Sequence, residues 1–146
     1  MKTKKKTMPT ICVDFDGVIH RYSNGWQEGV VYDPPVEGTK RAMKWFVERG
    51  YRVVILTARL QPRYPDIQEQ RAKMIQWLTK YGFNEGEHYH EITNNKPSAE
   101  MYIDNKAMRF TGNWKEIIQY LHEKEGQNVP PIGKRNGISA GHPDNH

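Results

Sequence analysis

An apolar run that ends directly in two aspartates constrains this chain more than any other feature. The run covers residues 10–13, and Asp14, Asp16 and Gly17 follow it. Side chains two residues apart in an extended chain point the same way, so both carboxylates reach one small volume. Two like charges at that separation are costly unless a cation or a shared proton relieves them. A hard cation such as Mg²⁺, which takes oxygen ligands, is the simplest solution.

Two further apolar runs end in polar residues in the same way. Residues 53–56 lead into Thr57, residues 101–103 lead into Asp104, and Lys96 lies in the polar loop before the second of these runs. In open α/β sheets, ligands bind just beyond the carboxyl ends of the strands. The three strand ends therefore predict one site that combines acids, a hydroxyl and an amine.

Strand and helix signals alternate along the chain. We expect strands at 10–14, 52–57, 90–93 and 101–104, an edge strand at 109–110, and helices at 33–49, 66–81 and 113–123. Two of these helices have capping-box pairs, Asp66 with Glu69 and Asn113 with Glu116. The alternation predicts an α/β fold with a mostly parallel sheet and helices on both faces. The stretch 17–31, which holds turn glycines and Trp26, predicts a short β-hairpin flap after the first strand.

At these residues the chain resembles the haloacid dehalogenase (HAD) superfamily of phosphohydrolases. The resemblance spans roughly residues 10–121, and the family's four motifs match in order: Asp14 and Asp16, then Thr57, then Lys96, then Asp104. Asn105 stands where the fourth motif often carries a second acid. The joint order and spacing carry the resemblance, because any one motif alone is common.

The resemblance implies a Rossmann-like fold and a Mg²⁺-dependent phosphatase. Asp14 would attack phosphorus and form an aspartyl-phosphate. Asp16 would protonate the leaving oxygen and then help to deprotonate the attacking water. Thr57 and Lys96 would bind the phosphate oxygens. The implied metal ligands are Asp14, Asp104, the backbone carbonyl of Asp16, and Asn105 through a metal-bound water.

No stretch of the sequence leaves room for the cap domain that many members of this superfamily carry. An open, capless site resembles those members that accept large or polymer-linked phosphates, or that close the site by forming a homo-oligomer. Candidate substrate-binding residues are His20 and Arg21 at the start of the flap and Arg59 two residues past Thr57. Trp26 is a candidate for stacking on a base, although a flap anchor packed on the core is the favoured role.

A phosphorylated nucleotide or a nucleic-acid end is the preferred substrate class. Short chains with this layout are similar to phage and bacterial HAD hydrolases and to the phosphatase domains of polynucleotide end-repair enzymes. Three alternatives stay open: a phosphatase for a small metabolite such as a sugar phosphate, a phosphotransferase, and a non-catalytic binding module that keeps the fold.

Charge and composition predict how the chain is divided and in which cellular compartment it lies. Four lysines near the N-terminus supply most of the formal net charge of +5, and residues 126–146 are crowded with Gly, Pro and Asn. We therefore expect a basic N-terminal stretch (1–9), a catalytic domain (10–125) and a C-terminal tail (126–146). The charged N-terminus lacks an apolar signal segment, no stretch is long enough to span a membrane, and Cys12 is the single cysteine. These features predict a cytoplasmic protein without membrane partners.

Overall fold

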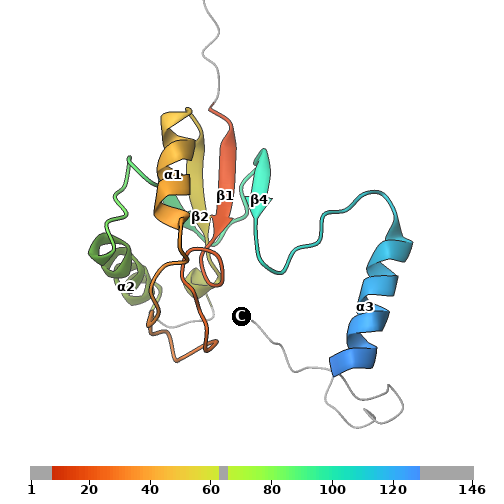
Figure 1. Cartoon of the computed structure of the whole chain (residues 1–146). Coiled ribbons are helices and arrows are strands. Elements are labelled where there is room, and N and C mark those ends of the chain that lie inside the picture. Colours follow the sequence, from red (N-terminus) through yellow and green to blue (C-terminus); the bar gives the residue numbers. More distant parts are fainter. Residues whose placement is uncertain (1–7, 63–65, 129–146) are drawn as a thin grey trace, which may run out of the picture. The chain divides into compact units, whose positions relative to one another are not determined.

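The computed structural model describes residues 8–62 and 66–128 (Figure 1). These residues fall into two compact units, one ending at Asn105 and the other beginning at Lys106, a division inside the expected domain 10–125. Most of the expected N-terminal stretch and C-terminal tail, residues 1–7 and 129–146, lies outside the described residues.

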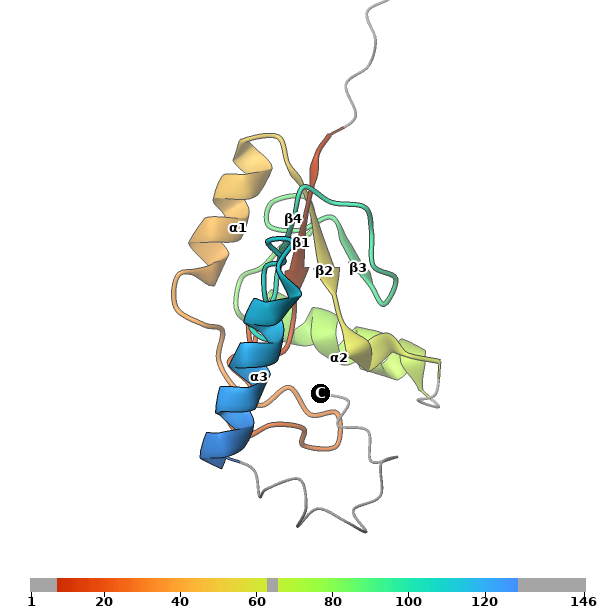
Figure 2. The ribbon, with the colours of Figure 1, turned by 90° about the vertical axis from the view of Figure 1, so that its right-hand side faces the viewer.

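The first unit is built on a four-stranded sheet in the order β3-β2-β1-β4 (Figure 2). All three strand pairs are parallel, and Val13 of β1 is level with Ile55 of β2 and Ile103 of β4. The strands are β1 (Thr10–Asp14), β2 (Arg52–Leu56), β3 (Glu91–Thr93) and β4 (Met101–Ile103). The predicted α/β fold with a parallel sheet is confirmed. The expected edge strand at 109–110 is not among the strands of the described residues.

Two helices and a short 3₁₀ turn connect these strands. They are α1 (Thr39–Glu48), η1 (Ala58–Leu60) and α2 (Ile67–Lys80). Helix α1 begins later than expected because the residues before it pair with the first loop, where the Val36 N–H donates to the Ile19 carbonyl at 2.9 Å. The expected capping box of α2 was wrong, since the Asp66 side chain makes no capping hydrogen bond.

One hydrophobic core joins the sheet to both α1 and α2. It contains Ile11 and Val13 from β1, Met43 from α1, and Met74 and Leu78 from α2. Alternate residues of β1 enter this core because successive side chains of a strand point to opposite faces. The buried residues of α2 are Met74, Trp77 and Leu78, whereas Ile75 is exposed.

The loop from Gly17 to Gly38 replaces the strand ladder expected of a hairpin flap. Its contacts resemble strand pairing only at isolated bridges, including one between His20 and Pro35. A hairpin flap is therefore not confirmed. The loop is nevertheless anchored, since the Trp77 indole N–H donates to the Asp33 carbonyl at 2.8 Å.

The second unit contains helix α3 (Trp114–Asn128). Asn113 caps it as expected, with its side-chain oxygen accepting the Lys115 N–H at 3.0 Å. Glu116 does not complete a capping box, because its carboxylate accepts from the Thr111 hydroxyl instead. The helix runs through Gly126, beyond its expected end. In the described part of the chain, no helix combines the length and apolar character needed to cross a membrane.

Candidate active site

The strand order creates a switch point between β1 and β4. From β1 the chain moves outward to β2 and β3, and then returns to the opposite side of β1 to form β4. The strand order reverses between these two neighbouring strands, and open parallel sheets bind ligands at such a point. Asp14 is the last residue of β1, and Asp104 directly follows β4. The sheet topology therefore brings the first and fourth sequence motifs together at the carboxyl ends of the strands.

The pKa of the buried Cys12 thiol on β1 is shifted by charges near the carboxyl ends of the strands. Its pKa is raised above the ordinary value, first by burial and then by the nearby charges of Asp14 and Asp104, while Lys96 lowers it. Asp14 is half-buried, whereas Lys96 and Asp104 are exposed, so this side of the site is open to solvent.

Lys96 also has a partner of its own. Its ammonium nitrogen lies 4.5 Å from the centre of the Tyr102 ring on β4, a cation–π contact. The Tyr102 hydroxyl in turn donates to the Pro97 carbonyl. The loop that carries Lys96 is thus held against the strand that leads into Asp104.

Asn105 lies against the turn that follows the two aspartates. Gly17 has φ +89°, and a Cβ built on it would lie 2.5 Å from the Asn105 side-chain nitrogen. Only glycine combines that backbone conformation with so close an approach. The turn and the fourth motif are therefore in contact.

The donors at this edge suit a hard divalent cation. Asp14 and Asp104 offer carboxylate oxygens and Asn105 an amide oxygen, which are the ligand types that Mg²⁺ prefers. Across residues 8–62 and 66–128, no three His, Cys, Asp or Glu side chains gather as a metal-binding group. A cation here would depend on two carboxylates, supplemented by amide and backbone oxygens.

Thr57 immediately follows β2, the strand beside β1. Its hydroxyl oxygen accepts the Arg59 backbone N–H at 3.1 Å, and its own N–H donates to the Thr93 carbonyl at 3.0 Å. The side chain is buried at the start of η1. Because a hydroxyl both accepts and donates, Thr57 keeps its hydrogen for a further acceptor.

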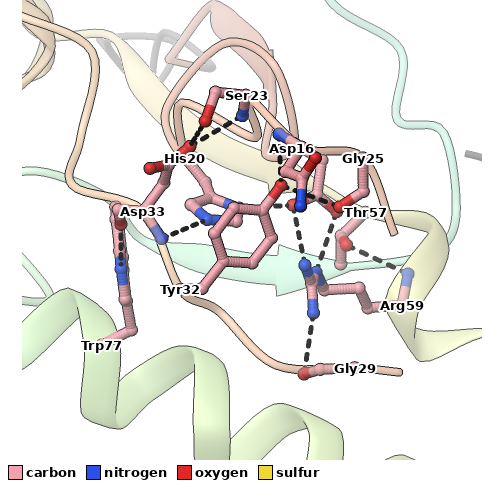
Figure 3. A network of polar contacts seen from close by, with 11 residues as sticks. Asp16, His20, Ser23, Gly25, Gly29, Tyr32, Asp33, Thr57, Arg59 and Trp77 are labelled. Carbon is pink, nitrogen blue, oxygen red and sulfur yellow. Dashed lines mark hydrogen bonds and ion pairs between the residues drawn. The ribbon is translucent and has the colours of Figure 1, made fainter. Parts of the chain in front are cut away.

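Asp16 is held by two basic side chains (Figure 3). Its carboxylate accepts from Arg59 Nε at 2.8 Å and Nη2 at 3.0 Å, and from His20 Nδ1 at 2.8 Å. Burial raises the pKa of Asp16, but the hydrogen bonds from His20 and Arg59 and the charge of Arg59 outweigh it, so the pKa lies below its ordinary value. Asp16 therefore points into a network within the protein.

The predicted substrate-binding residues differ in exposure. Arg59 and His20 are buried beside Asp16, whereas Arg21 is exposed on the loop. The half-buried Trp26 lies beside Arg59, whose guanidinium carbon is 5.2 Å from the indole ring centre. Contact of these residues with a substrate stays a prediction.

Several residues that support the network around Asp16 could not be recognised as site residues from the sequence. The Gly29 carbonyl accepts from Arg59 Nη1 at 3.0 Å, and the Asp33 N–H donates to His20 Nε2 at 3.0 Å. Both contacts use backbone atoms, which every residue type has. Trp77 was the one recognisable signal, since a large aromatic residue with a polar N–H usually packs and finds an acceptor.

Comparison with known proteins adds no family to this geometry. No protein-family model matches the chain, and no curated protein matches it.

Proposed function

We propose that this chain is a Mg²⁺-dependent phosphatase that hydrolyses a phosphate monoester through an aspartyl-phosphate on Asp14. The observation that carries the proposal is that Asp14 ends β1 and Asp104 follows the neighbouring β4 at the switch point, with Lys96 held against Tyr102 of β4. A nucleophilic carboxylate, a cation and a second acid at one open edge are what phosphoryl transfer by this route requires.

The reaction proceeds in two displacements. A carboxylate oxygen of Asp14 attacks phosphorus, and the bond from phosphorus to the leaving oxygen breaks with its electron pair on that oxygen, which takes a proton from Asp16. Asp16 acquires this proton when the negative charge of the bound phosphate raises its pKa, which the free protein holds below the ordinary value. A water then attacks the same phosphorus and gives a proton to Asp16, while the electron pair of the Asp14–phosphorus bond returns to the carboxylate. The net products are the alcohol and inorganic phosphate.

The remaining polar residues hold the phosphoryl group. Lys96 balances its charge, and the Thr57 hydroxyl donates to one of its oxygens. Asp14, Asp104 and the Asp16 carbonyl, with Asn105 through a metal-bound water, would hold Mg²⁺, which would supply further charge neutralisation.

The wider fold and setting are part of the same proposal. We place the chain among capless HAD-type proteins, with a Rossmann-like sheet covered on both faces, a flap over the site, and a cytoplasmic location. The parallel sheet and its switch point support this fold. A nucleotide or nucleic-acid end is the preferred substrate because the exposed side of the site admits a large phosphate and because lysines crowd the N-terminal sequence.

The test is phosphate release from p-nitrophenyl phosphate, with and without Mg²⁺, by the wild type and by Asp14→Asn. Turnover that needs Mg²⁺ and disappears in Asp14→Asn supports the aspartyl-phosphate route. Nucleotides, DNA and RNA ends and sugar phosphates then identify the substrate class. If none of these substrates is hydrolysed, the phosphatase proposal is wrong and a binding role takes its place.

A further inference from the structure

The guanidinium of Arg59 makes three hydrogen bonds within the protein. The side chain is 1% exposed, and it donates to both oxygens of Asp16 and to the Gly29 carbonyl. Donation by Nε and Nη2 to the two oxygens of one carboxylate fixes the plane of that carboxylate, which a single hydrogen bond does not. Arg59 thereby connects the chain after Thr57, the first motif and the loop at Gly29 (Figure 3).

His20 holds the same carboxylate from the loop side. Its Nε2 accepts the backbone N–H of Asp33, and a backbone N–H can only donate. The ring hydrogen is therefore assigned to Nδ1, which donates to Asp16 Oδ1. His20 is 0% exposed, and its ring lies 5.6 Å from that of Phe15, centre to centre.

These bonds treat the two oxygens of Asp16 differently. Oδ1 accepts from both His20 and Arg59, which uses both of its lone pairs. Oδ2 accepts from Arg59 Nε, so among these bonds it keeps one lone pair. The network thus leaves Oδ2 as the oxygen able to exchange a proton with a bound molecule.

We propose that Arg59 and His20 are positioning residues. They orient the Asp16 carboxyl so that its Oδ2 gives a proton to the leaving oxygen and then accepts a proton from the attacking water. This inference rests on the phosphatase function proposed above. It gives both side chains a role within the protein in place of substrate contact. Through Gly29 and Asp33 it also makes the orientation of Asp16 depend on the conformation of the loop 17–38.

The energetic reason is the precision that proton transfer needs. A proton donor acts across a hydrogen bond of about 3 Å, and misplacement by about 1 Å costs about a hundredfold in rate. An aspartate side chain has two rotatable bonds, and the three donors from Arg59 and His20 remove that freedom. Asp16 is held by donors on two separate segments, so a change in either one moves it.

Comparing substrates with different leaving groups distinguishes a positioning role of Arg59 and His20 from a general contribution to the fold. An alkoxide is a poor leaving group and needs the Asp16 proton, whereas p-nitrophenolate leaves as a stabilised anion and does not. Loss of orientation at Asp16 therefore slows an alkyl phosphate more than an aryl phosphate. Damage to the fold lowers both rates by the same factor.

The experiment compares kcat for a nucleoside 5′-monophosphate and for p-nitrophenyl phosphate, with Mg²⁺, in Arg59→Lys and His20→Asn. Lysine keeps the charge but loses the two-point contact, and asparagine keeps a donor for Asp16 but loses the acceptor for Asp33. We expect the alkyl rate to fall about tenfold further than the aryl rate in Arg59→Lys, and His20→Asn to retain more alkyl activity than His20→Ala. Arg71→Lys is the matched control, since Arg71 also donates to a backbone carbonyl, that of Ile92, outside the network.

A double-mutant cycle completes the test. If Arg59 acts through Asp16, Arg59→Lys lowers the alkyl rate no further once Asp16→Asn is present. Equal losses on both substrates, or additive losses in the cycle, overturn the inference while leaving the phosphatase function standing. A raised KM with unchanged kcat also overturns it, because that result indicates direct substrate binding by Arg59. If the wild type does not hydrolyse the nucleoside 5′-monophosphate, the alkyl substrate is taken from the DNA ends, RNA ends or sugar phosphates that it does hydrolyse, and failure on all of them overturns the proposed function and this inference with it.

Discussion

The side chain of Asn105 lies against the backbone of Gly17, where a Cβ would approach its amide nitrogen to 2.5 Å. This contact joins the turn after the first motif to the last residue of the fourth motif. The two residues are far apart in sequence, so the contact exists only because β4 pairs with β1.

Replacing Gly17 tests this contact. We expect Gly17→Ala to lower the free energy of unfolding by about 1–2 kcal/mol, because alanine is strained at φ +89°, and to displace Asn105. Gly25→Ala is the control, since Gly25 also has a positive φ, +66°, but no atom within 4 Å of its built Cβ. Urea unfolding should show similar losses for both, while only Gly17→Ala raises the Mg²⁺ concentration needed for half-maximal turnover. The same Mg²⁺ requirement in both variants would argue against a role for the contact.

Adding a charge at Asn105 tests the proposed metal site. Asn105→Asp supplies a third carboxylate beside Asp14 and Asp104, so we expect Mg²⁺ to bind several-fold more tightly, by about 1 kcal/mol. Calorimetric titration with Mg²⁺ measures this directly, and the Mg²⁺ dependence of turnover should shift in the same direction. Unchanged affinity would remove Asn105 from the set of metal ligands.

Two substitutions at Thr57 separate its hydroxyl from its methyl group. Thr57→Val leaves the buried N–H of Arg59 without its acceptor, so we expect a loss of about 1–2 kcal/mol in unfolding free energy and of phosphate binding. Thr57→Ser keeps the hydroxyl and should retain most of both properties. Thermal unfolding and KM for p-nitrophenyl phosphate are the measurements. Equal behaviour of serine and valine would show that the hydroxyl is dispensable.

The buried His88 predicts how stability depends on pH. Its Nδ1 accepts the Asn84 N–H at 3.0 Å, so the nearby Glu87 carboxylate, 3.9 Å away, does not form an ion pair with a protonated ring in this geometry. Burial lowers the pKa of His88, an effect that exceeds the opposing influence of Glu87.

The sign of the effect follows from proton binding. The unfolded chain takes up the proton first, so the free energy of unfolding falls as pH drops below about 6.5 and levels off below the folded-state pKa. We expect His88→Gln to weaken the pH dependence of the free energy of unfolding, measured by urea unfolding between about pH 5 and pH 7. His122→Gln, at an exposed position on α3, is the control. A slope that persists in His88→Gln would assign the pH dependence to other groups.

The strands of the first unit could be predicted because their signal is local. The run 10–13 is apolar and rich in β-branched residues, and β1 begins and ends where expected. Strand β2 also begins where expected and ends at Leu56, one residue before its expected end. Such patterns need no knowledge of the rest of the chain.

The network around Asp16 could not be predicted in the same way. Arg59 follows Thr57 closely enough to suggest a role in a pocket, but an arginine is usually exposed, and its burial depends on acceptors at Asp16 and Gly29. The late start of α1 has a similar cause, because Val36 pairs with Ile19 instead of joining the helix. These are contacts between segments, and no local pattern encodes them.

The position of β4 beside β1 also determines when the site can form during folding. Asp14 and Thr57 become neighbours once β1 and β2 pair, but Asp104 joins them only when β4, a strand of three residues, adds to the far side of β1. Closing so long a loop costs entropy before its contacts repay it. We therefore expect Asp104 to be the last of these three residues to take its place in the candidate site as this unit folds.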